Sequence, residues 1–483
     1  MKRFLSLWLL AVMLVLTACS GNNTSDDTSE TTDNPSESTV SELTSEQISD
    51  DLPNDLDYDG YEFRVHSRYA PIYFNYTVST DQETGDVVND AIYKRDRALE
   101  ERLNIKFTET TYDNVTDGQE VPRKLIMAGD DTYDLFVARC FQSFAWAIEG
   151  LLVDWNSLDY IDLDKPYWEK SLNDAFVLND SMYFAAGAFN LTAYEWTHTV
   201  LFNKTIHEAL SLDDPYSIVN DGLWTYDKFY EMAQTAVSDV NGDGIMDAED
   251  RYGFVSSSVQ ILPSFWIGAD TLSIKRDTDG RFYYSTPTDE KFITVVTRVL
   301  EMMWDGGLWK TGLGHTTVDD ILKFYSDEHG LFANANFYHI SKLRNMDADF
   351  GILPYPKWDE AQSEYISRIE GCEMPIVPVT NTSLERTGAI LEALASESLD
   401  TVVPAYYDLA ITGKYTRDEE SIEMLDIITS NRVFDYGDTI LCAQIRDGIL
   451  ATVMKNNDRE IVSALEGHAG VVEARLKEIN IAE

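Results

Sequence analysis

The segment DVNGDGIMDAED, residues 239–250, has the residue types and the spacing of an EF-type calcium loop. Ca²⁺ is a hard cation that takes oxygen ligands. Such a loop supplies them from positions 1, 3, 5, 7, 9 and 12, with glycine at position 6 for the sharp turn. Gly244 stands at position 6. The ligand positions hold Asp239, Asn241, Asp243, Ile245 through its backbone carbonyl, Asp247 and Asp250. The segment predicts a bound Ca²⁺; an acidic turn without a metal is the alternative.

The surroundings of the loop favour a structural role for the ion. Asp250 stands where a bidentate Glu is more usual, which lowers the expected affinity. Thr225 is a suitable N-cap for a helix that runs directly into the loop. An apolar side chain at position 7, here Ile245, can point into the core. There is no second such loop, because residues 277–280 are too few and predict a hairpin turn. We therefore predict a permanently filled site away from any ligand cleft.

The first residues have the features of an export signal. Lys2 and Arg3 precede an apolar segment, 4–16, that is too short for an ordinary membrane span. The next residues, LTAC, end at Cys19 and resemble the lipobox of bacterial lipoproteins. The resemblance implies cleavage of a signal peptide, residues 1–18, and a lipid on the Cys19 thiol; a plain secretory signal is the alternative.

The segment after Cys19 predicts a disordered acidic tether at residues 19–56. It is rich in Ser, Thr, Asp, Glu and Asn and contains no Lys or Arg. Such a composition cannot bury enough apolar surface to offset the entropy of ordering the chain.

The composition limits the classes of function. The chain of 483 residues carries a formal net charge of −47. Binding to a phosphate backbone needs clustered Lys and Arg, so nucleic acid is excluded as a partner. A hydrophobic content of 44% supports a folded core. Cys140, Cys372 and Cys442 are expected to be small buried fillers, with at most one disulfide among them.

Strands and helices alternate at the start of the folded chain. Hydrophobic periodicity predicts three strands and three helices in turn, at 61–67, 90–103, 104–108, 121–128, 133–138 and 144–152. This order is typical of a doubly wound parallel sheet, an α/β fold. Ligands bind beyond the carboxyl ends of the strands in such sheets. Residues 138–142, after the third strand, are therefore the first candidate for a ligand site.

Several segments, in this order along the chain, resemble extracellular solute-binding proteins of the maltose- and oligosaccharide-binding type (family 1). The resemblance begins with the lipobox and the acidic tether and continues over residues 60–440. The segments are YDLFVA at 133–138, GLLVDW at 150–155, LNDSMYFAAG at 178–187, LFNK at 201–204, WT at 224–225, GLFANAN at 330–336 and DFGILPYP at 349–356. Some members of this family also carry an EF-like loop directly after the WT helix, where the loop of this chain stands.

The resemblance implies a two-lobed periplasmic-binding-protein-like fold of type II, in which hinged α/β lobes close on a ligand in a central cleft. The implied parts are a signal peptide at 1–18, a tether at 19–56, lobe 1 at 57–187 plus about 375–420, and lobe 2 at 188–374 plus about 421–483. The implied protein is a monomeric, lipid-anchored lipoprotein on the outer side of the cell membrane. It captures a carbohydrate, best an oligosaccharide, for the permease subunits of an ABC importer.

Candidate ligand residues follow from the same resemblance. Sugar sites combine aromatic faces with a few fixed polar groups. Arg139 is the main polar candidate, because a charge directly after an apolar strand needs a partner or a ligand. An ion pair with one of the many acids is the alternative. The other candidates are Phe141, Asn190, Trp196, Trp224, Trp266, Phe337 and Tyr338, with Glu195 weaker; for each aromatic residue, a place in the core is the alternative.

Motifs of common enzyme classes, such as Gly-x-Ser-x-Gly and His-Glu-x-x-His, are absent from the sequence, so no enzymatic activity is expected. Two other functions stay open. One is a surface-anchored polysaccharide-degrading enzyme, whose paired carboxylates have a spacing that exists only in three dimensions. The other is a calcium-dependent adhesion or scaffold protein, which the single loop and the lack of repeats oppose.

Overall fold

The computed structural model describes residues 50–68, 75–112, 115–313, 318–346, 349–409 and 419–481. All of them belong to one compact unit of the chain. Among these residues, no helix is both long and apolar enough to cross a membrane. The expected signal peptide, Cys19 and most of the expected tether lie outside the described residues.

The folded unit begins earlier than the expected end of the tether at residue 56. Leu52 is buried, and the Asp50 carboxylate forms an ion pair with Arg102 at 2.5 Å. Residues 50–56 therefore belong to the folded part of the chain, because one apolar side chain and one charge in this segment already have partners there.

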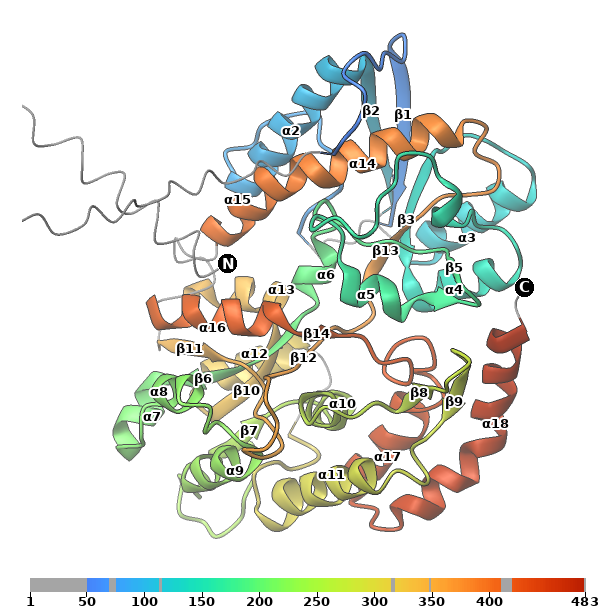
Figure 1. Ribbon diagram of the computed structural model, residues 1–483. Helices are drawn as coiled ribbons and strands as arrows, with labels where there is room; N and C mark the ends of the chain where they lie inside the picture. Colours follow the sequence, from blue (N-terminus) through green and yellow to red (C-terminus); the bar gives the residue numbers. More distant parts are fainter. Residues whose placement is uncertain are drawn as a thin grey trace, which may run out of the picture. The chain divides into compact units, whose positions relative to one another are not determined.

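The first sheet has four strands in the order β13-β3-β1-β2 (Figure 1). β1 (Tyr61–Ser67) pairs in parallel with β2 (Ile105–Thr111) and β3 (Leu135–Arg139), and β13 (Glu373–Ile376) pairs antiparallel with β3. The helices that follow the three parallel strands are α2 (Val87–Leu103), α3 (Val115–Met127) and α4 (Cys140–Ile148). The predicted alternation of strands and helices is confirmed, and the carboxyl ends of three strands lie at one edge.

Local sequence sets the ends of α2. The Asp86 carboxylate accepts hydrogen bonds from the amides of Val88 and Asn89, which satisfies two free donors of the first turn. Asn104 ends the helix in the left-handed conformation, with φ 49°. The buried face between these caps recurs at helical spacing and holds Ile92, Leu99 and Leu103.

The second sheet also has four strands, in the order β11-β6-β10-β7 (Figure 1). β10 (Gly330–Asn336) pairs in parallel with β7 (Tyr252–Val255) and antiparallel with β6 (His198–Asn203), and β6 pairs antiparallel with β11 (Phe350–Leu353). Asn336 lies opposite His198. The carboxyl end of β10 and the amino end of β6 therefore meet at one edge.

Shorter strands and further helices complete the described chain. They are η1 (Trp155–Ser157), α5 (Lys170–Ala175), β4 (Val177–Leu178), β5 (Ser181–Met182), α6 (Thr192–Glu195), α7 (Lys204–Leu210), α8 (Pro215–Asn220), α9 (Tyr226–Thr235), α10 (Ser258–Gly268), β8 (Ile274–Arg276), β9 (Phe282–Tyr284), α11 (Glu290–Leu300), η2 (Glu301–Asp305), α12 (Val318–Ser326), α13 (Phe337–Ile340), η3 (Ser341–Asn345), β12 (Ser367–Arg368), α14 (Leu384–Asp400), α15 (Val402–Leu409), α16 (Glu419–Ser430), β14 (Arg432–Val433), η5 (Arg446–Leu450), α17 (Ala451–Asn456) and α18 (Ile461–Ile481).

The chain crosses between the two sheets more than once. It leaves the first sheet through residues 188–197, which include α6, and returns through residues 367–372, which include β12. These two crossings run side by side: Thr197 and Ile369 form an antiparallel bridge, and the Glu370 amide donates to the Trp196 carbonyl at 3.2 Å. A third crossing follows because α14 and α15 contact α2, whereas α16 contacts β11 (Figure 1). Two α/β halves joined by crossings form the predicted two-lobed fold; the lobe boundaries stay a prediction.

Candidate functional site

The candidate site lies at the carboxyl edge of the first sheet, where β3 ends. The guanidinium carbon of Arg139 lies 4.8 Å from the ring centre of Phe141 and 5.3 Å from that of Trp196. The Trp196 ring in turn lies 6.4 Å from His339 of α13, edge to face. A strand end, a crossing and a helix of the second half thus supply one stack of a cation and aromatic rings. We call these residues, Phe141, Arg139, Trp196 and His339, the crossing stack.

Helix α13 brings two more predicted residues to the same crossing. The Phe337 amide donates to the Thr197 carbonyl at 3.3 Å. The Nζ atom of Lys342 lies 4.7 Å from the ring centre of Tyr338. Both aromatic side chains are buried. The structure therefore places Phe337 and Tyr338 beside the crossing stack rather than in its row of rings.

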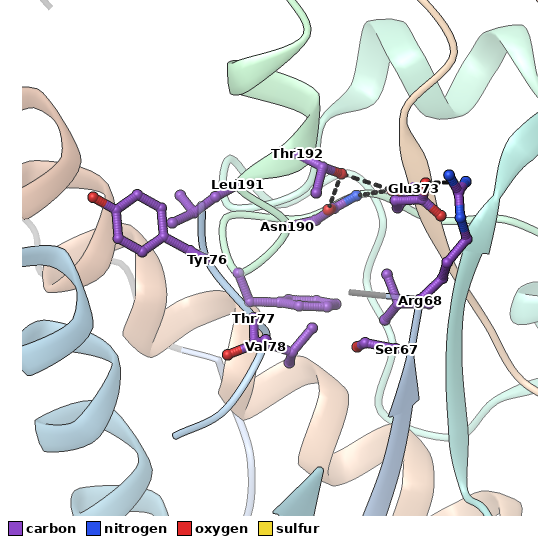
Figure 2. Close-up of a pocket in the computed structure, with 11 residues that line it drawn as sticks. Ser67, Arg68, Tyr76, Thr77, Val78, Asn190, Leu191, Thr192 and Glu373 are labelled. Carbon is purple, nitrogen blue, oxygen red and sulfur yellow. Dashed lines mark hydrogen bonds and ion pairs between the residues drawn. The ribbon is translucent and has the colours of Figure 1, made fainter. Parts of the chain in front are cut away.

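A small cavity lies next to the stack, at the ends of β1 and β3 (Figure 2). Its volume is about 20 Å³, which is room for one water-sized group. Its polar lining comes from Ser67, Arg68, Thr77, Asn190, Thr192 and Glu373. Because Glu373 pairs with Arg139 in the β13–β3 ladder, the cavity adjoins the crossing stack.

Glu373 is the centre of the hydrogen bonds around the cavity (Figure 2). Its carboxylate accepts a hydrogen bond from Nη1 of Arg68 at 2.7 Å, and both side chains are buried. Its carbonyl accepts hydrogen bonds from Nδ2 of Asn190 and Oγ1 of Thr192, each at 2.9 Å. Burial raises the pKa of Glu373 to about 7, although Arg68 and Arg139 act to lower it. Its Oε2 atom has no hydrogen-bond partner among the described residues.

The first crossing holds another buried carboxyl group. Glu195 in α6 accepts hydrogen bonds from the backbone amide of Asn75 at 3.1 Å and from its Nδ2 at 2.6 Å. Burial raises the pKa of Glu195 to about 8, and the hydrogen bonds from Asn75 act to lower it. Glu195 is therefore placed to hold the segment that follows β1 against the crossing.

A buried polar network occupies the edge of the second sheet at the returning crossing. Arg368 of β12 makes two hydrogen bonds to Asp438, at 2.6 and 2.7 Å. The Glu370 carboxylate accepts a hydrogen bond from Arg446 at 2.9 Å and lies 3.2 Å from Nε2 of His198. Burial and the charge of Arg368 lower the pKa of His198. The network attaches the returning crossing to the second sheet through paired charges, which a buried charge requires.

Two predicted ligand residues lie in the core instead. Trp224 is fully buried, its ring centre lies 5.8 Å from that of Phe332, and its Nε1 donates to the Pro354 carbonyl at 2.9 Å. Trp266 of α10 is fully buried, 5.4 Å from the ring centre of Phe292. We therefore exclude Trp224 and Trp266 from the candidate site, because the core takes up both indole rings.

Sequence reasoning missed several residues that the structure places here: Ser67, Arg68, Thr192, His339 and Glu373. The sequence could have indicated Arg68, because it directly follows the predicted strand at 61–67, as Arg139 directly follows the predicted strand at 133–138. It could not have indicated Glu373, since 305 positions separate this residue from its partner Arg68. Of the eight predicted ligand residues, the structure brings Arg139, Phe141 and Trp196 into the stack, Asn190 into the cavity wall, and Phe337 and Tyr338 beside them.

The predicted calcium loop has tight turns that its own carboxylates stabilise. Gly242 and Gly244 adopt the left-handed conformation, with φ 74° and 82°, and both donate their amides to the Asp239 carboxylate at 2.7 Å. Glycine is needed at these two positions because a side chain is strained there. Asp250, at the end of the loop, is fully buried. Ile245 is 61% exposed, so its side chain does not point into the core here: it lies on the exposed turn.

No group of three or more His, Cys, Asp or Glu side chains in the described part of the chain is placed to hold a metal ion. In the loop, the carboxylates instead accept hydrogen bonds from the loop's own amides; that of Asp250, for example, accepts from Val240 and Asp247 at 2.8 Å. The donor set is all oxygen, which suits Ca²⁺. The bound ion stays a prediction.

The three cysteines of the described chain, Cys140, Cys372 and Cys442, are free of disulfides there and buried. This confirms that they act as small apolar fillers. The Cys140 amide donates to the Cys372 carbonyl at 3.1 Å, so these two residues lie beside each other where β3 meets the returning crossing.

Comparison with known proteins gives the fold. No family model matches the chain, and no curated protein is significantly similar to it in sequence. Among solved structures, a cyclo/maltodextrin-binding protein in complex with maltotetraose has 12% identity and a TM-score of 0.60, over 86% of this chain and 97% of that one. A galacto-N-biose-/lacto-N-biose I-binding protein of an ABC transporter from Bifidobacterium longum, in complex with lacto-N-biose, has 14% identity and a TM-score of 0.58, over 88% and 98%. RafE from Streptococcus pneumoniae has 14% identity and a TM-score of 0.55, over 86% and 99%. The chain has the fold of these proteins.

Proposed function

We propose that this protein, which has the solute-binding-protein fold, is the substrate-binding component of an ABC importer and captures an oligosaccharide between its two halves. The observation that carries the proposal is the crossing stack, which combines a strand end of the first sheet, a crossing and a helix of the second half. Sugars present apolar C–H faces and many hydroxyl groups, which suit aromatic rings beside a few fixed polar groups. Two of the proteins with this fold are solved with oligosaccharides.

Closure of the halves explains why the stack is buried. Trp196 is 7% exposed, and the neighbouring residues of α13 are buried as well. A ligand can reach these rings only when the halves separate. The crossings are short and lie beside the site, so they are the hinge of this motion.

The buried carboxyls of the site favour binding over catalysis. A glycoside hydrolase needs two carboxyl groups that face a scissile bond from opposite sides. Here Glu195 is held by three hydrogen bonds from Asn75, and Glu373 is paired with Arg68. We therefore propose no enzymatic activity.

The same proposal covers the ends of the chain and its partners. We propose that Cys19 carries a lipid, that residues 19–49 tether the folded unit to the outer face of the cytoplasmic membrane, and that the monomeric protein delivers its ligand to permease subunits. The Cys19→Ala protein should then appear in the medium instead of the membrane fraction of expressing cells. Retention of this variant on membranes would contradict the anchor.

We further propose that the loop at 239–250 holds a structural Ca²⁺. The oxygens of Asp239, Asn241, Asp243, Asp247 and Asp250, with the carbonyl of Ile245, would hold it. The chemistry of this donor set supports the proposal, because Ca²⁺ prefers carboxylate, amide and carbonyl oxygens in a flexible loop. Its charge would offset the repulsion between the four carboxylates.

A thermal-shift screen tests the proposed function. The protein without its signal peptide is heated with each member of a panel of oligosaccharides, and with peptides and free amino acids as the control classes. A ligand that binds only the folded state raises the Tm, so at least one oligosaccharide should raise it, without release of reducing ends. The proposal fails if no carbohydrate raises the Tm, or if reducing ends accumulate.

A further inference from the structure

The cavity beside the crossing stack presents a free hydrogen-bond acceptor to its interior. Two of the donors in its wall are in use: Nδ2 of Asn190 and Oγ1 of Thr192 both donate to the Glu373 carbonyl at 2.9 Å. Oγ of Ser67 is buried without a hydrogen-bond partner in the described part of the chain. Nη1 of Arg68 donates to one carboxylate oxygen of Glu373 at 2.7 Å. The other oxygen, Oε2, is buried without a hydrogen-bond partner in the described part of the chain. A buried acceptor in this position favours a guest that can donate.

The size of the cavity limits that guest to one small group. A volume of about 20 Å³ exceeds the roughly 10–15 Å³ that one water needs and leaves no room for a second heavy group. A hydroxyl group fits this volume. A carboxylate or a phosphate, with two or three terminal oxygens, does not.

The place of the cavity makes it accessible to a ligand rather than only to solvent. It lies at the carboxyl ends of β1 and β3, which are parallel neighbours in the first sheet, and ligands of open α/β sheets bind at this edge. Glu373 lies opposite Arg139 in the ladder. A sugar ring held at the crossing stack would therefore have the cavity beside it.

We propose that this cavity is a specificity-determining subsite, in which Glu373 receives one hydroxyl group of a neutral sugar and excludes the carboxylate of an acidic one. The inference rests on the proposed function and adds the class of sugar: neutral oligosaccharides rather than oligosaccharides of uronic acids.

The exclusion follows from charge and from hydrogen bonding. A hydroxyl group can both donate, to Oε2 of Glu373, and accept, from Oγ of Ser67, and neither of these atoms has another hydrogen-bond partner among the described residues. Above the pKa of Glu373, which is about 7, a ligand carboxylate would meet Oε2 without a proton between the two oxygens, at the cost of burying two like charges together. Sites built to bond a hydroxyl group reject analogues without it by large factors, because their own polar atoms are left unpaired.

Arg68 is the cation that an acidic sugar would need, and its geometry opposes this role. Its guanidinium is fully buried and holds Glu373 in an ion pair. A ligand carboxylate that took Nη1 of Arg68 would displace Glu373, which would then be left as a buried carboxyl without its partner. The pair thus opposes the binding of an anion at this nitrogen.

Matched ligands test the inference in the wild-type protein. Dissociation constants are measured by titration calorimetry at about pH 8, above the pKa of Glu373. The ligands are neutral trisaccharides of glucose and of galactose, and the corresponding glucuronic and galacturonic acid trisaccharides, in which carboxylates replace the hydroxymethyl groups. We expect the neutral member of a bound pair to bind at least about 100-fold more tightly. Equal affinity, or binding of the acidic members alone, overturns the inference and leaves the proposed function standing.

The variant Glu373→Gln tests whether Glu373 determines the preference for the neutral sugar. An amide can both donate and accept, so we expect the preference for the neutral sugar to fall at least about tenfold. Glu392→Gln is the matched control, because Glu392 is another buried carboxyl of the first half that accepts hydrogen bonds from Trp168 and Asp162 and does not line the cavity. An unchanged preference in Glu373→Gln overturns the assignment.

If Glu373→Gln does not fold, Ser67→Ala, which removes a smaller group from the same wall, should weaken binding of the neutral sugar about threefold; unchanged affinity overturns the subsite. If no sugar of any kind binds the wild-type protein, the proposed function fails and the inference falls with it.

Discussion

Trp196 links the two halves of the molecule through both its backbone and its ring. Its carbonyl accepts a hydrogen bond from the Glu370 amide of the returning crossing, and its ring contacts both Arg139 and His339. Sugar rings stack on such faces, and a cation beside the ring adds about 0.5–2 kcal/mol. Under the proposed function, these contacts would give Trp196 a role both in the hinge and in ligand binding.

We predict that Trp196→Ala weakens oligosaccharide binding at least about tenfold, as measured by titration calorimetry, because the aromatic face is lost. Trp224→Phe is the control: its ring is in the core of the second half, so it should lower the Tm and leave the affinity of the folded protein unchanged. An unchanged affinity in Trp196→Ala would remove the crossing stack from the site.

The buried pair of Arg68 and Glu373 is expected to be costly to break. Removing one partner of such a pair leaves a charge without compensation, at about 3–5 kcal/mol. We predict that Arg68→Met lowers the free energy of unfolding by about this amount in urea denaturation, and that the double variant Arg68→Met with Glu373→Leu recovers a large part of it. If the two losses simply add, the pair is not coupled.

Sequence reasoning found residues of the site where a charge or ring stands at an element end. Arg139 was predicted because it follows an apolar strand, and Arg68 follows the same rule. The structure places Trp224 and Trp266 in the core, and composition does not separate a buried aromatic ring from one that faces a ligand. Glu373 could not be predicted, since its partner is determined by the pairing of β13 with β3.

At the scale of elements, hydrophobic periodicity predicted most strands and helices of the two sheets, and Thr225 caps α9 as expected, with its side chain accepting from the Lys228 amide. The pairing of distant elements was not predictable from periodicity. β13 joins the first sheet after an excursion through the whole second sheet, and only the packed structure sets this register.

Removal of the proposed Ca²⁺ tests the structural role of the loop at 239–250. We predict that a Ca²⁺ chelator lowers the Tm and that added Ca²⁺ restores it, because the ion would bind the folded loop only. Asp243→Ala should abolish the effect of the chelator, whereas Asp279→Ala, in the acidic hairpin turn between β8 and β9, should not. Ligand affinity should not change in Asp243→Ala. Loss of sugar binding in a folded Asp243→Ala protein would show that the loop does more than stabilise.

At the scale of the whole molecule, buried carboxyls set the dependence of stability on pH. Burial raises the pKa of three of them to about 7 and of the fourth to about 8; they are Glu109, Glu373, Glu392 and Glu195. Between the ordinary pKa of Glu and these values, the folded state holds protons that the unfolded state has lost. Their contribution to stability is therefore present at low pH and is lost as pH rises through 7 and 8.

Buried histidines make the stability rise with pH, which is the opposite effect, but they do so in a lower range of pH. Burial lowers the pKa of His66 to about 4 and that of His339 to about 3, so the unfolded state takes up protons below the ordinary pKa of His, near 6.5. Of these carboxyls and histidines, only the carboxyls therefore change the stability above this pH. We predict that the Tm falls by a few degrees as pH rises from 6.5 to 8.5, measured by calorimetry at constant ionic strength. Glu392→Gln should reduce the slope, and a Tm that rises over this range would contradict the prediction.

The buried thiol of Cys372 provides a chemical probe of how often the two halves separate. Burial raises the pKa of Cys372 to about 12, so its thiolate does not form while the returning crossing stays packed against β3, and a thiol reagent must wait for the halves to separate. In the Cys19→Ala protein, we expect the rate of reaction with a chromogenic disulfide to fall as a sugar ligand saturates the site. Equal rates with and without ligand would mean that Cys372 is exposed by local fraying instead. The rate of this reaction would then report how often the hinge opens, in a protein that carries no attached label.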